Sequence, residues 1–388
     1  MAQPFDLSFN ARRIVSDIRR VGPMSRADLA RTLSITPSTV TRLTMQLMDG
    51  GLLCEHDDTN RKPQKGYPAK LLHLNSRGLC TAGVYIDPDR IMTCISTLSG
   101  DILAQDEMAV PDRSFGAIMS AAGAGVKKLI KEADVEMNRM AGCGVSYPGR
   151  YSQDPTRVLR ISQFKDWPKV NIRRDLYPYF GMPVQHMNDA KAASLAELYH
   201  GTASNLQNFC YIWLSYGIGG AAVVDQHPYL GRNDGAAEWG GLFPKSKPRP
   251  SGQDLLESMA RGGLPLNRLS DFSDEHLTHP AVIHWCERAS EQIRWICLVI
   301  ARTFAPQAIV IGGTLHSKII EGFIRDITDH DSLGEEFDQT SPKIIRASRD
   351  HLPQLGPAAL PVHNVLSPEK YLGQIKKGMW FFGGLANI

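Results

Sequence analysis

The stretch from Ser25 to Leu53 constrains the fold more than any other part of the chain, because its capping signals define two short helices joined by a tight turn. Ser25 is a favoured N-cap residue, and Asp28 places a negative charge in the first turn of the helix that follows. Thr36 is the expected N-cap of the second helix and Pro37 its first residue, where a missing N–H costs no hydrogen bond. The turn and the end of the second helix are expected at Ser34-Ile35 and at Asp49-Gly50-Gly51.

The second helix of this pair has one apolar and one polar face. Val40, Leu43 and Leu47 recur at helical spacing and predict the buried face. The opposite face carries short polar side chains and one arginine, which suits insertion of the start of a recognition helix into the major groove of DNA. The residues predicted to contact DNA from this helix are Ser38, Thr39, Thr41 and Arg42.

A two-stranded wing is expected after the helix pair, with strands at 52–56 and 69–74. The polar loop between them carries three cations predicted to contact DNA phosphates, Arg61, Lys62 and Lys65. Residues 1–78 hold twelve Lys and Arg and seven Asp and Glu, a net charge of +5, whereas the whole chain carries +3. The positive charge is therefore concentrated in residues 1–78, for which we predict a winged helix-turn-helix DNA-binding domain. The alternative is an ordinary helical subdomain with a solvated hairpin.

The chain beyond residue 78 has the pattern of an α/β protein. Its 388 residues, 43% of them apolar, suffice for a small N-terminal module and larger lobes. We predict two similar lobes, each with a mixed sheet, and a ligand site in the cleft between them. The expected strands are 82–86, 91–98, 102–109, 142–146, 183–186, 209–214, 221–225 and 308–311, and the expected helices are 115–133, 190–199 and 280–304.

Several classes of protein are disfavoured by the composition. No apolar run approaches the eighteen residues of a membrane span, and the N-terminus lacks the apolar stretch of a signal peptide. The seven cysteines lie far apart without a CxxC pair, which argues against a disulfide scaffold and a zinc site. A cytoplasmic protein is expected.

Five motifs together give the chain a family resemblance. They are GVSYPGRYS (144–152), MNDAKAASLAE (187–197), LSYGIGGAAVVDQHPYLGRNDGAAEWGG (214–241), APQAIVIGGTL (305–315) and LGPAALPV (355–362). With these motifs the chain resembles the ROK family (repressors, open reading frames and kinases), whose fold is the two-lobed, actin-like and ribonuclease-H-like fold of sugar kinases. The resemblance implies a ROK domain over 79–388, with lobes near 79–190 plus the C-terminal helix and 191–375.

The chain departs from this family where kinases bind nucleotide phosphates. Kinases of this fold open with an Asp-x-Gly-Gly-Thr turn, but here the stretch is YIDPDRI (85–91), in which Pro88 and Asp89 remove backbone donors and add a negative charge. Tyr216 stands where the second phosphate turn of kinases has a small residue. We therefore expect no ATP binding.

The zinc module of the family is also missing. Its members usually carry Glu-x-Gly-His followed by three cysteines, whereas this chain has Glu238-Trp239-Gly240-Gly241 followed by KSKPRPSGQDLLES. A zinc site needs about four N or S ligands, so no metal cofactor is expected. The loop must be held by packing, for which Trp239, Phe243 and its prolines are the candidates.

A sugar site is implied by the resemblance. Asn188, Asp189, Glu238 and Glu257 fall on the family's sugar-contacting positions, and Gln163 lies in a loop where an asparagine commonly reaches a hydroxyl. Buried unpaired carboxylates are costly, which favours a ligand. The alternatives are an N-cap for Asn188-Asp189 and a solvated helix position for Glu257. The missing histidine at Gly241 suggests a larger sugar or one that is not a pyranose.

Two functions fit these features. The first is a transcriptional regulator of carbohydrate genes, expected to be a repressor, in which a homodimer or homotetramer binds double-stranded operator DNA under control of a sugar effector. The second is an active ATP-dependent sugar kinase with Asp189 as general base. The degenerate phosphate turns favour the regulator. Control by a protein partner is a third possibility that the residues do not address.

Overall fold

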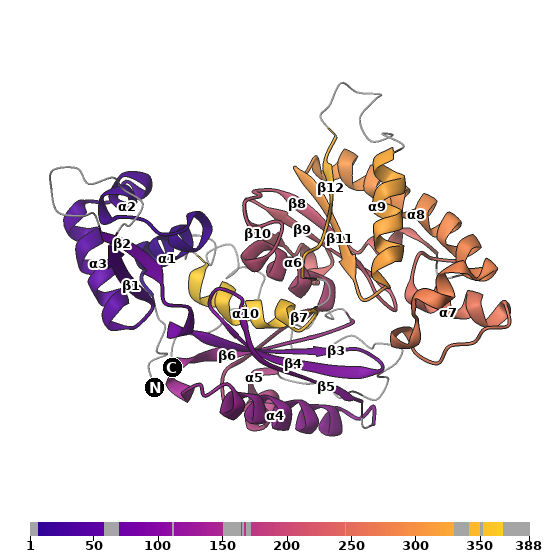
Figure 1. Ribbon diagram of the computed structural model, residues 1–388, viewed down its shortest axis with the longest axis horizontal. Coiled ribbons are helices and arrows are strands. Elements are labelled where there is room, and N and C mark those ends of the chain that lie inside the picture. Colours follow the sequence, from indigo (N-terminus) through magenta and orange to yellow (C-terminus); the bar gives the residue numbers. More distant parts are fainter. Residues whose placement is uncertain are drawn as a thin grey trace.

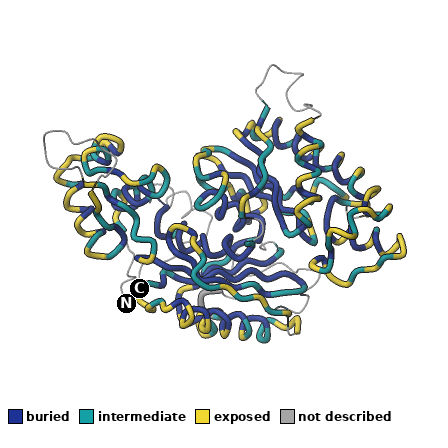
Figure 2. The backbone as a smooth tube through the Cα atoms, in the orientation of Figure 1, coloured by how far each residue is buried: buried dark blue, intermediate teal, exposed yellow. Residues whose placement is uncertain are grey.

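The computed structural model describes residues 7–57, 70–110, 112–149, 164, 167, 172–244, 246–329, 341–349 and 352–367. Figure 1 shows an N-terminal domain at one end, a first lobe built on one sheet, and a second lobe built on another. Buried backbone follows both sheets and the helices between them (Figure 2). None of the described helices is long and apolar enough to span a bilayer.

The N-terminal domain contains three helices and a hairpin. The caps expected from the sequence are present, because Ser25 Oγ accepts from the Asp28 N–H at 3.1 Å and Thr36 Oγ1 accepts from the Thr39 N–H at 3.4 Å. Ser34 ends the first helix of the pair in the left-handed region, with φ at 53°. The elements are α1 (Phe9–Val21), α2 (Arg26–Leu33), α3 (Pro37–Asp49), β1 (Leu53–Asp57) and β2 (Lys70–Leu74), with β1 and β2 antiparallel.

The first lobe is a five-stranded sheet of order β5-β4-β3-β6-β7, in which β3, β6 and β7 run parallel. Side chains of β3 alternate, so Ala82, Val84 and Ile86 join the core beneath the sheet with α4 and α5. The elements are β3 (Cys80–Ile86), β4 (Arg90–Thr97), β5 (Ile102–Ala109), α4 (Phe115–Glu132), β6 (Met140–Tyr147), α5 (Ile172–Phe180) and β7 (Val184–Asn188). Short 3-10 turns lie at Ser76–Gly78 and Met137–Arg139.

The second lobe repeats this arrangement with the order β10-β9-β8-β11-β12. Helix α6 (Asp189–His200) leads from the first lobe to this lobe. The elements of the second lobe are β8 (Phe209–Leu214), β9 (Ile218–Val224), β10 (His227–Tyr229), α7 (Gly252–Arg261), α8 (Pro280–Phe304), β11 (Ala308–Gly313), α9 (Ser317–Asp329) and β12 (Lys343–Arg346). Strand β8 is buried on both faces: Cys210, Ile212 and Leu214 pack toward α8 and α9, and the alternate residues pack toward α6. Its 3-10 turns are η3 (Arg232–Asp234), η4 (Trp239–Leu242), η5 (Leu269–Asp271) and η6 (Asp274–Thr278).

Helices α6 and α10 (Leu355–Leu366) pack together between the two sheets (Figure 1). Two glycines let α10 approach the first sheet: Gly83 on β3 and Gly144 on β6, which pair in the ladder. A Cβ on Gly83 would overlap the Gln354 carbonyl oxygen, and one on Gly144 would overlap that of Pro357. Only glycine therefore permits this contact between helix and sheet backbone.

Helix α10 also completes the core of the N-terminal domain. Val362, Val365 and Leu366 are buried in the same apolar cluster as the residues of α1, α2 and α3. Arg12 of α1 donates from one guanidinium nitrogen to the carbonyls of Ser367 at 2.9 Å and Asn364 at 3.3 Å. The N-terminal domain thus packs directly against α10.

Substitution of Gly144 tests this docking. Gly144→Ala is expected to lower the free energy of unfolding by about 1–3 kcal/mol, because the new methyl group must push α10 away from the sheet. The apparent melting temperature measured by circular dichroism should fall accordingly.

Gly116, near the start of α4, is the matched control, since a Cβ there meets nothing within 4 Å. Gly116→Ala should leave stability unchanged or raise it by up to about 1 kcal/mol. Equal melting temperatures for the two variants would contradict the proposed glycine contact.

Candidate DNA-binding face and effector cleft

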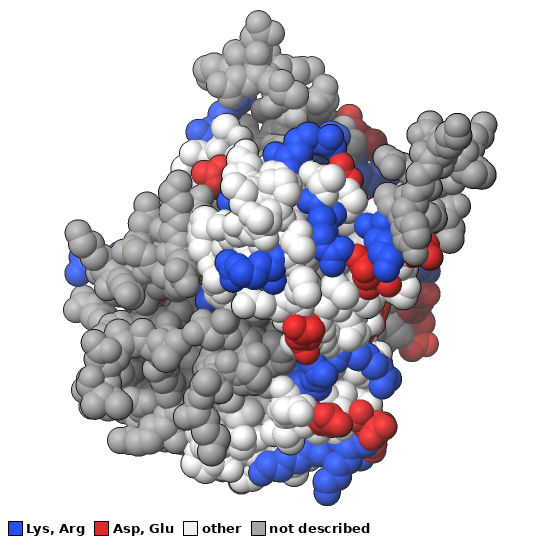
Figure 3. All heavy atoms as spheres, turned by 90° about the vertical axis from the view of Figure 1, so that its left-hand side faces the viewer, with Lys and Arg blue, Asp and Glu red and all other residues white. Residues whose placement is uncertain are grey.

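The face of α3 predicted to contact DNA is open to solvent. Ser38, Thr41 and Arg42 are exposed and Thr39 is partly exposed, whereas Val40, Leu43 and Leu47 are buried. Met45 adds an exposed apolar side chain to this face. Figure 3 looks at this end of the molecule and shows Lys and Arg side chains spread over it with Asp and Glu among them. Arg61, Lys62 and Lys65 lie outside the described residues.

The polar side chains on α3 are partly engaged with one another. Thr36 Oγ1 donates to Thr39 Oγ1 at 2.8 Å, and Thr41 Oγ1 donates to the Pro37 carbonyl at 2.9 Å. Arg42 reaches Gln46 Oε1 at 3.3 Å across one helical turn. These contacts fix the side chains on the helix without burying them.

A group of polar side chains meets where β6 and β7 end and α6 begins. We call Asn188, Asp189, Lys191, Asp234 and Glu238 the cleft cluster. Asn188, Asp189 and Lys191 come from the end of β7 and the first turn of α6. In the second lobe, Asp234 is the last residue of η3 and Glu238 directly precedes η4. The structure therefore brings three predicted sugar residues, Asn188, Asp189 and Glu238, to one place.

Asn188 caps α6, as the alternative interpretation expected. Its Oδ1 accepts from the N–H groups of Ala190 at 3.1 Å and Lys191 at 3.4 Å, and its Nδ2 donates to the Gly149 carbonyl at 3.0 Å. Within the described residues, Gly149 is the one acceptor for Nδ2, so its second hydrogen is available to a ligand. Capping and ligand contact are thus compatible in the same amide.

Two carboxyl groups of the cluster are buried and hard to ionise. Burial raises the pKa of Asp189 to about 6, opposed by the hydrogen bond from the Ala190 N–H and by the charge of Lys191. Burial also raises the pKa of Asp234 to about 6, again opposed by Lys191. The carboxylate of Glu238 adds to both shifts by repulsion. Asp189 thus has the pKa of a group that can accept a proton near neutral pH.

Lys191 is a residue that the sequence interpretation did not single out. Its side chain is 2% exposed, and its ammonium group pairs with Glu238 Oε1 at 3.2 Å. Lys191 directly follows the Asn-Asp-Ala motif. A lysine in the first turn of a helix expected to be buried was the sequence signal that could have identified it as a site residue.

Glu257 lies apart from the cluster. It is exposed on α7, accepts from Gln253 Nε2 at 3.0 Å, and lines a pocket of about 360 Å³. Arg113, Asp89, Tyr216 and Asn267 also line this pocket. Among the described residues no contact joins Glu257 to the cleft cluster. Gln163 lies outside the described part of the chain.

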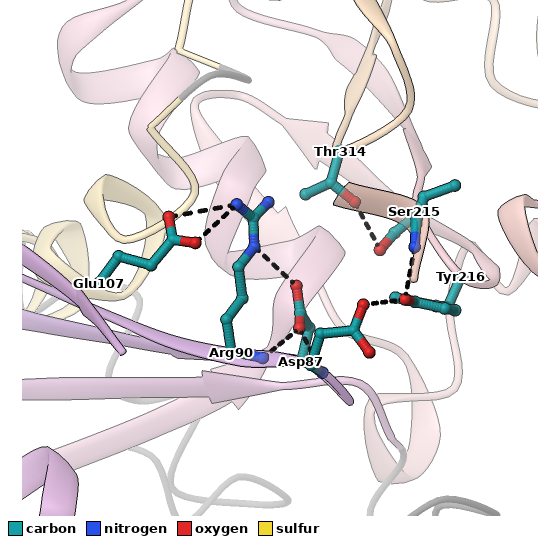
Figure 4. Close-up of polar contacts among 8 residues, drawn as sticks. Asp87, Arg90, Glu107, Ser215, Tyr216 and Thr314 are labelled. Atoms are coloured by element: carbon teal, nitrogen blue, oxygen red, sulfur yellow. Dashed lines mark hydrogen bonds and ion pairs between the residues drawn. The ribbon is translucent and has the colours of Figure 1, made fainter. Parts of the chain in front are cut away.

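The first phosphate turn is closed on itself (Figure 4). Asp87 Oδ1 accepts from the N–H groups of Asp89 and Arg90, both at 2.9 Å, and its other oxygen pairs with Arg90 Nε at 3.3 Å. Arg90 is held in turn by Glu107 at 3.2 Å. Burial raises the pKa of Asp87, an effect that these bonds oppose. Asp87 therefore engages the backbone N–H groups of both Asp89 and Arg90.

The second phosphate turn is bridged to the first by Tyr216. Its hydroxyl donates to Asp89 Oδ2 and accepts from the Leu269 N–H at 2.8 Å. Ser215, next to it, accepts from Thr314 Oγ1 at 2.9 Å, which joins the second turn to the one after β11 (Figure 4). The tyrosine thus links Asp89 of the first lobe with Leu269 of the second lobe.

The loop expected to lack zinc is held by packing and hydrogen bonds. Trp239 is buried against Gly220 and donates from Nε1 to the Tyr211 carbonyl at 2.9 Å. Arg249 donates to the Phe243 carbonyl at 2.9 Å. In the part of the chain that the structure describes, no group of three or more His, Cys, Asp or Glu side chains is arranged to hold a metal ion.

Helix α6 connects the cleft cluster with the N-terminal domain. At its far end, the Tyr199 carbonyl accepts from Arg19 of α1 at 2.6 Å, and the guanidinium group stacks over the Tyr199 ring at 4.6 Å. The Tyr199 hydroxyl bonds His363 Nδ1 of α10 at 2.8 Å. The sequence did not predict these contacts, because Arg19 and Tyr199 are 180 residues apart and Tyr199 and His363 are 164 residues apart.

Comparisons with known proteins agree with this geometry. The model of the ROK family matches residues 81–253. An uncharacterized protein of Sinorhizobium fredii, y4fQ, is 32% identical over 339 residues, which cover 85% of each chain. The N-acetylglucosamine repressor of Escherichia coli O157:H7 is 22% identical over 382 residues, covering 90% of this chain and 91% of the repressor.

Solved structures show the same fold. A ROK family transcriptional regulator, a homolog of the E. coli MLC protein, covers 95% of this chain and 99% of its own at 19% identity with a TM-score of 0.71. A ROK glucokinase from Streptomyces griseus in complex with glucose and AMPPNP covers 72% of this chain and 98% of its own at 21% identity with a TM-score of 0.57.

The fold and the matches define a winged-helix protein with the two lobes of an actin-like sugar-kinase fold. The chain belongs to the ROK family.

The raised pKa of Asp234 predicts a pH-dependent cost to stability. Because its native pKa of about 6 exceeds the ordinary value of 3.8, the native state holds this proton more tightly, and stability falls as pH rises between these values. Asp234→Asn should therefore stabilise the protein at pH 8, by on the order of 1–3 kcal/mol, and much less at pH 4. Thermal unfolding at both pH values measures the difference.

Asp134 is a matched control for this substitution. It is exposed and, like Asp234, adopts a positive φ (51° against 55°). Asp134→Asn should shift the melting temperature equally at the two pH values. The same result for Asp234→Asn would show that its carboxyl group is not raised in pKa.

Proposed function

We propose that this protein is a DNA-binding transcriptional regulator, acting as a repressor of carbohydrate-metabolism genes, whose lobes bind a sugar or sugar derivative. The observation that carries the proposal is the physical link between an exposed recognition helix and a buried polar cleft through α6 and α10. The printed names of the relatives point the same way, since one is an N-acetylglucosamine repressor and another a transcriptional regulator.

The N-terminal domain supports the DNA-binding half of the proposal. Its α2–turn–α3 unit has both caps formed, and α3 presents Ser38, Thr41 and Arg42 to solvent. Short polar side chains and one arginine at the start of a helix suit base edges in the major groove. A homodimer would place two such helices on half-sites about one DNA turn apart.

The cleft supports the sensor half. Hydroxyl groups of a sugar can donate to the carboxylates of Asp189 and Glu238 and accept from the Asn188 amide. Closing on such a ligand moves the second lobe against α6, and α6 ends on Arg19 of the N-terminal domain. A ligand that prefers one arrangement of the lobes then changes operator affinity by its differential binding to the two states.

The alternative function is an ATP-dependent sugar kinase, and Asp189 favours it. Its pKa of about 6 suits a general base that takes a proton from an attacking hydroxyl. Against it stand the occupied donors of the first turn and the Tyr216 bridge across the phosphate position. Sugar-dependent release of ADP in a coupled assay would favour the kinase over the regulator.

Operator binding tests the recognition helix. Arg42→Ala is expected to weaken binding to the operator at fixed salt by about ten- to a hundredfold, because one base or phosphate contact of 1–3 kcal/mol is lost. The operator is first selected from genomic fragments with the wild-type protein, and affinities follow from fluorescence anisotropy.

Arg325 provides the control, because it is exposed on α9 in the second lobe. Arg325→Ala should bind the operator like wild type. Unchanged affinity of the Arg42 variant would refute the assignment of α3.

Coupling between the cleft and DNA is expected to depend on Arg19. Arg19→Met removes its bond to Tyr199 and the stacking charge while keeping an unbranched apolar chain. The variant should still be stabilised by the effector, but the ratio of operator affinities without and with effector should shrink several-fold toward one. Thermal shift and anisotropy give the two quantities separately.

The neighbouring Arg20 points elsewhere and pairs with Asp17 at 3.1 Å. Arg20→Met should keep the wild-type ratio, whatever it does to absolute affinity. A wild-type ratio in the Arg19 variant would mean that the signal does not pass through α6 and Tyr199.

A further inference from the structure

The buried ammonium group of Lys191 sits in an acidic environment. It bonds Glu238 directly, and its charge also stabilises the carboxylates of Asp189 and Asp234. A lysine head group carries three N–H donors, and among the described residues only Glu238 accepts from it. Donors of a fully buried ammonium group are rarely left without acceptors, so the remaining N–H groups of Lys191 are candidates to donate to acceptor atoms of a ligand.

A second polar group beside the cluster has no partner. Tyr147, 3% exposed, ends β6 and pairs in the ladder with Asn188 at the end of β7. Within the described part of the chain its hydroxyl makes no hydrogen bond. Burial raises the pKa of this hydroxyl, and the carboxylate of Asp234 adds to the effect. An unsatisfied buried hydroxyl next to Asn188 is an independent sign of a ligand position.

The charge of the cluster limits what that ligand can be. Among the described residues, one ammonium group pairs with Glu238 and acts electrostatically on Asp189 and Asp234, so these four groups carry a formal sum of −2 when all are ionised. His186, stacked on the Tyr147 ring, adds no positive charge near neutral pH, since burial lowers its pKa to about 3. A phosphate or carboxylate brought into this place would lose its hydration and meet net repulsion, whereas hydroxyl groups can donate to the carboxylates and accept from Lys191.

We infer that the cleft cluster binds an uncharged polyhydroxylated sugar and rejects its phosphorylated and acidic derivatives, with Lys191 and Tyr147 as donors to the sugar and the three carboxylates as acceptors. This inference rests on the proposed function, because it specifies the class of the effector. It assigns specificity to Lys191, Asp234 and Tyr147, which lie outside the set of sugar residues predicted from the sequence.

The test compares ligands in matched sets, each made of an aldose, its terminal phosphate ester and its uronic acid. Isothermal titration of the full-length protein follows a thermal-shift screen of hexose and pentose sets. The expected result is that an uncharged sugar binds at least a hundredfold more tightly than its phosphate or uronic acid. Equal or tighter binding of the phosphate or uronic acid would refute this inference but would still agree with the proposed function as a sugar-responsive regulator. If no member of any set bound, the proposed function would be refuted as well.

Variants test whether the cleft cluster causes the preference for uncharged sugars. Asp234→Asn removes one negative charge, so the affinity ratio of neutral to phosphorylated sugar should fall by about tenfold. The control Glu132→Gln changes an exposed carboxylate on α4 and should keep the ratio. Lys191→Met with Glu238→Gln removes the ion pair as a unit, which avoids an unpaired buried charge, and should weaken neutral-sugar binding by tenfold or more. A ratio unmoved by Asp234→Asn, or a pair variant that binds neutral sugar like wild type, would refute the assignment.

Discussion

The contact between α10 and the paired glycines of the first sheet is the constraint on which the rest of the structure depends. Gly83 and Gly144 bring the sheet backbone against the Gln354 and Pro357 carbonyls, so α10 lies close enough to share a core with α6. The far end of α10 then supplies Val362, Val365 and Leu366 to the core of the N-terminal domain. One helix thereby joins all three parts of the molecule (Figure 1).

Helix α6 has a comparable position with a different consequence. It is 12 residues long, about 18 Å, and both of its ends are polar sites in an otherwise buried setting. Asp189 and Lys191 lie at the start, and Tyr199 meets Arg19 and His363 at the end. A rigid helix between the cleft cluster and the N-terminal domain needs no long chain of side chains to couple them, because displacement of one end displaces the other.

The two turns that align with the phosphate turns of kinases are each held by contacts within the protein. Asp87 is satisfied by its own turn and Arg90, and Tyr216 spans the lobes to Asp89. The loop in which the zinc ligands of the family were expected also contains internal hydrogen bonds, from Trp239 to the Tyr211 carbonyl and from Arg249 to the Phe243 carbonyl.

Local sequence alone determined much of this protein. The caps at Ser25 and Thr36 and the helix 280–304 were predictable because the interactions that form them lie within a few residues. The strand 209–214 was predictable from its apolar run, although its partner β11 lies about a hundred residues further along the chain. Helices α1, α5 and α9 and the short strands β10 and β12 were not predicted; β10 and β12 are edge strands set by their sheet neighbours.

Only the tertiary structure decided which distant groups meet. It paired Lys191 with Glu238, 47 residues away, set Tyr147 beside Asn188, and left Glu257 exposed on α7. The charge of a cleft and the path from it to DNA depend on such long-range contacts, because Coulomb and packing energies follow distance in space and not distance along the chain.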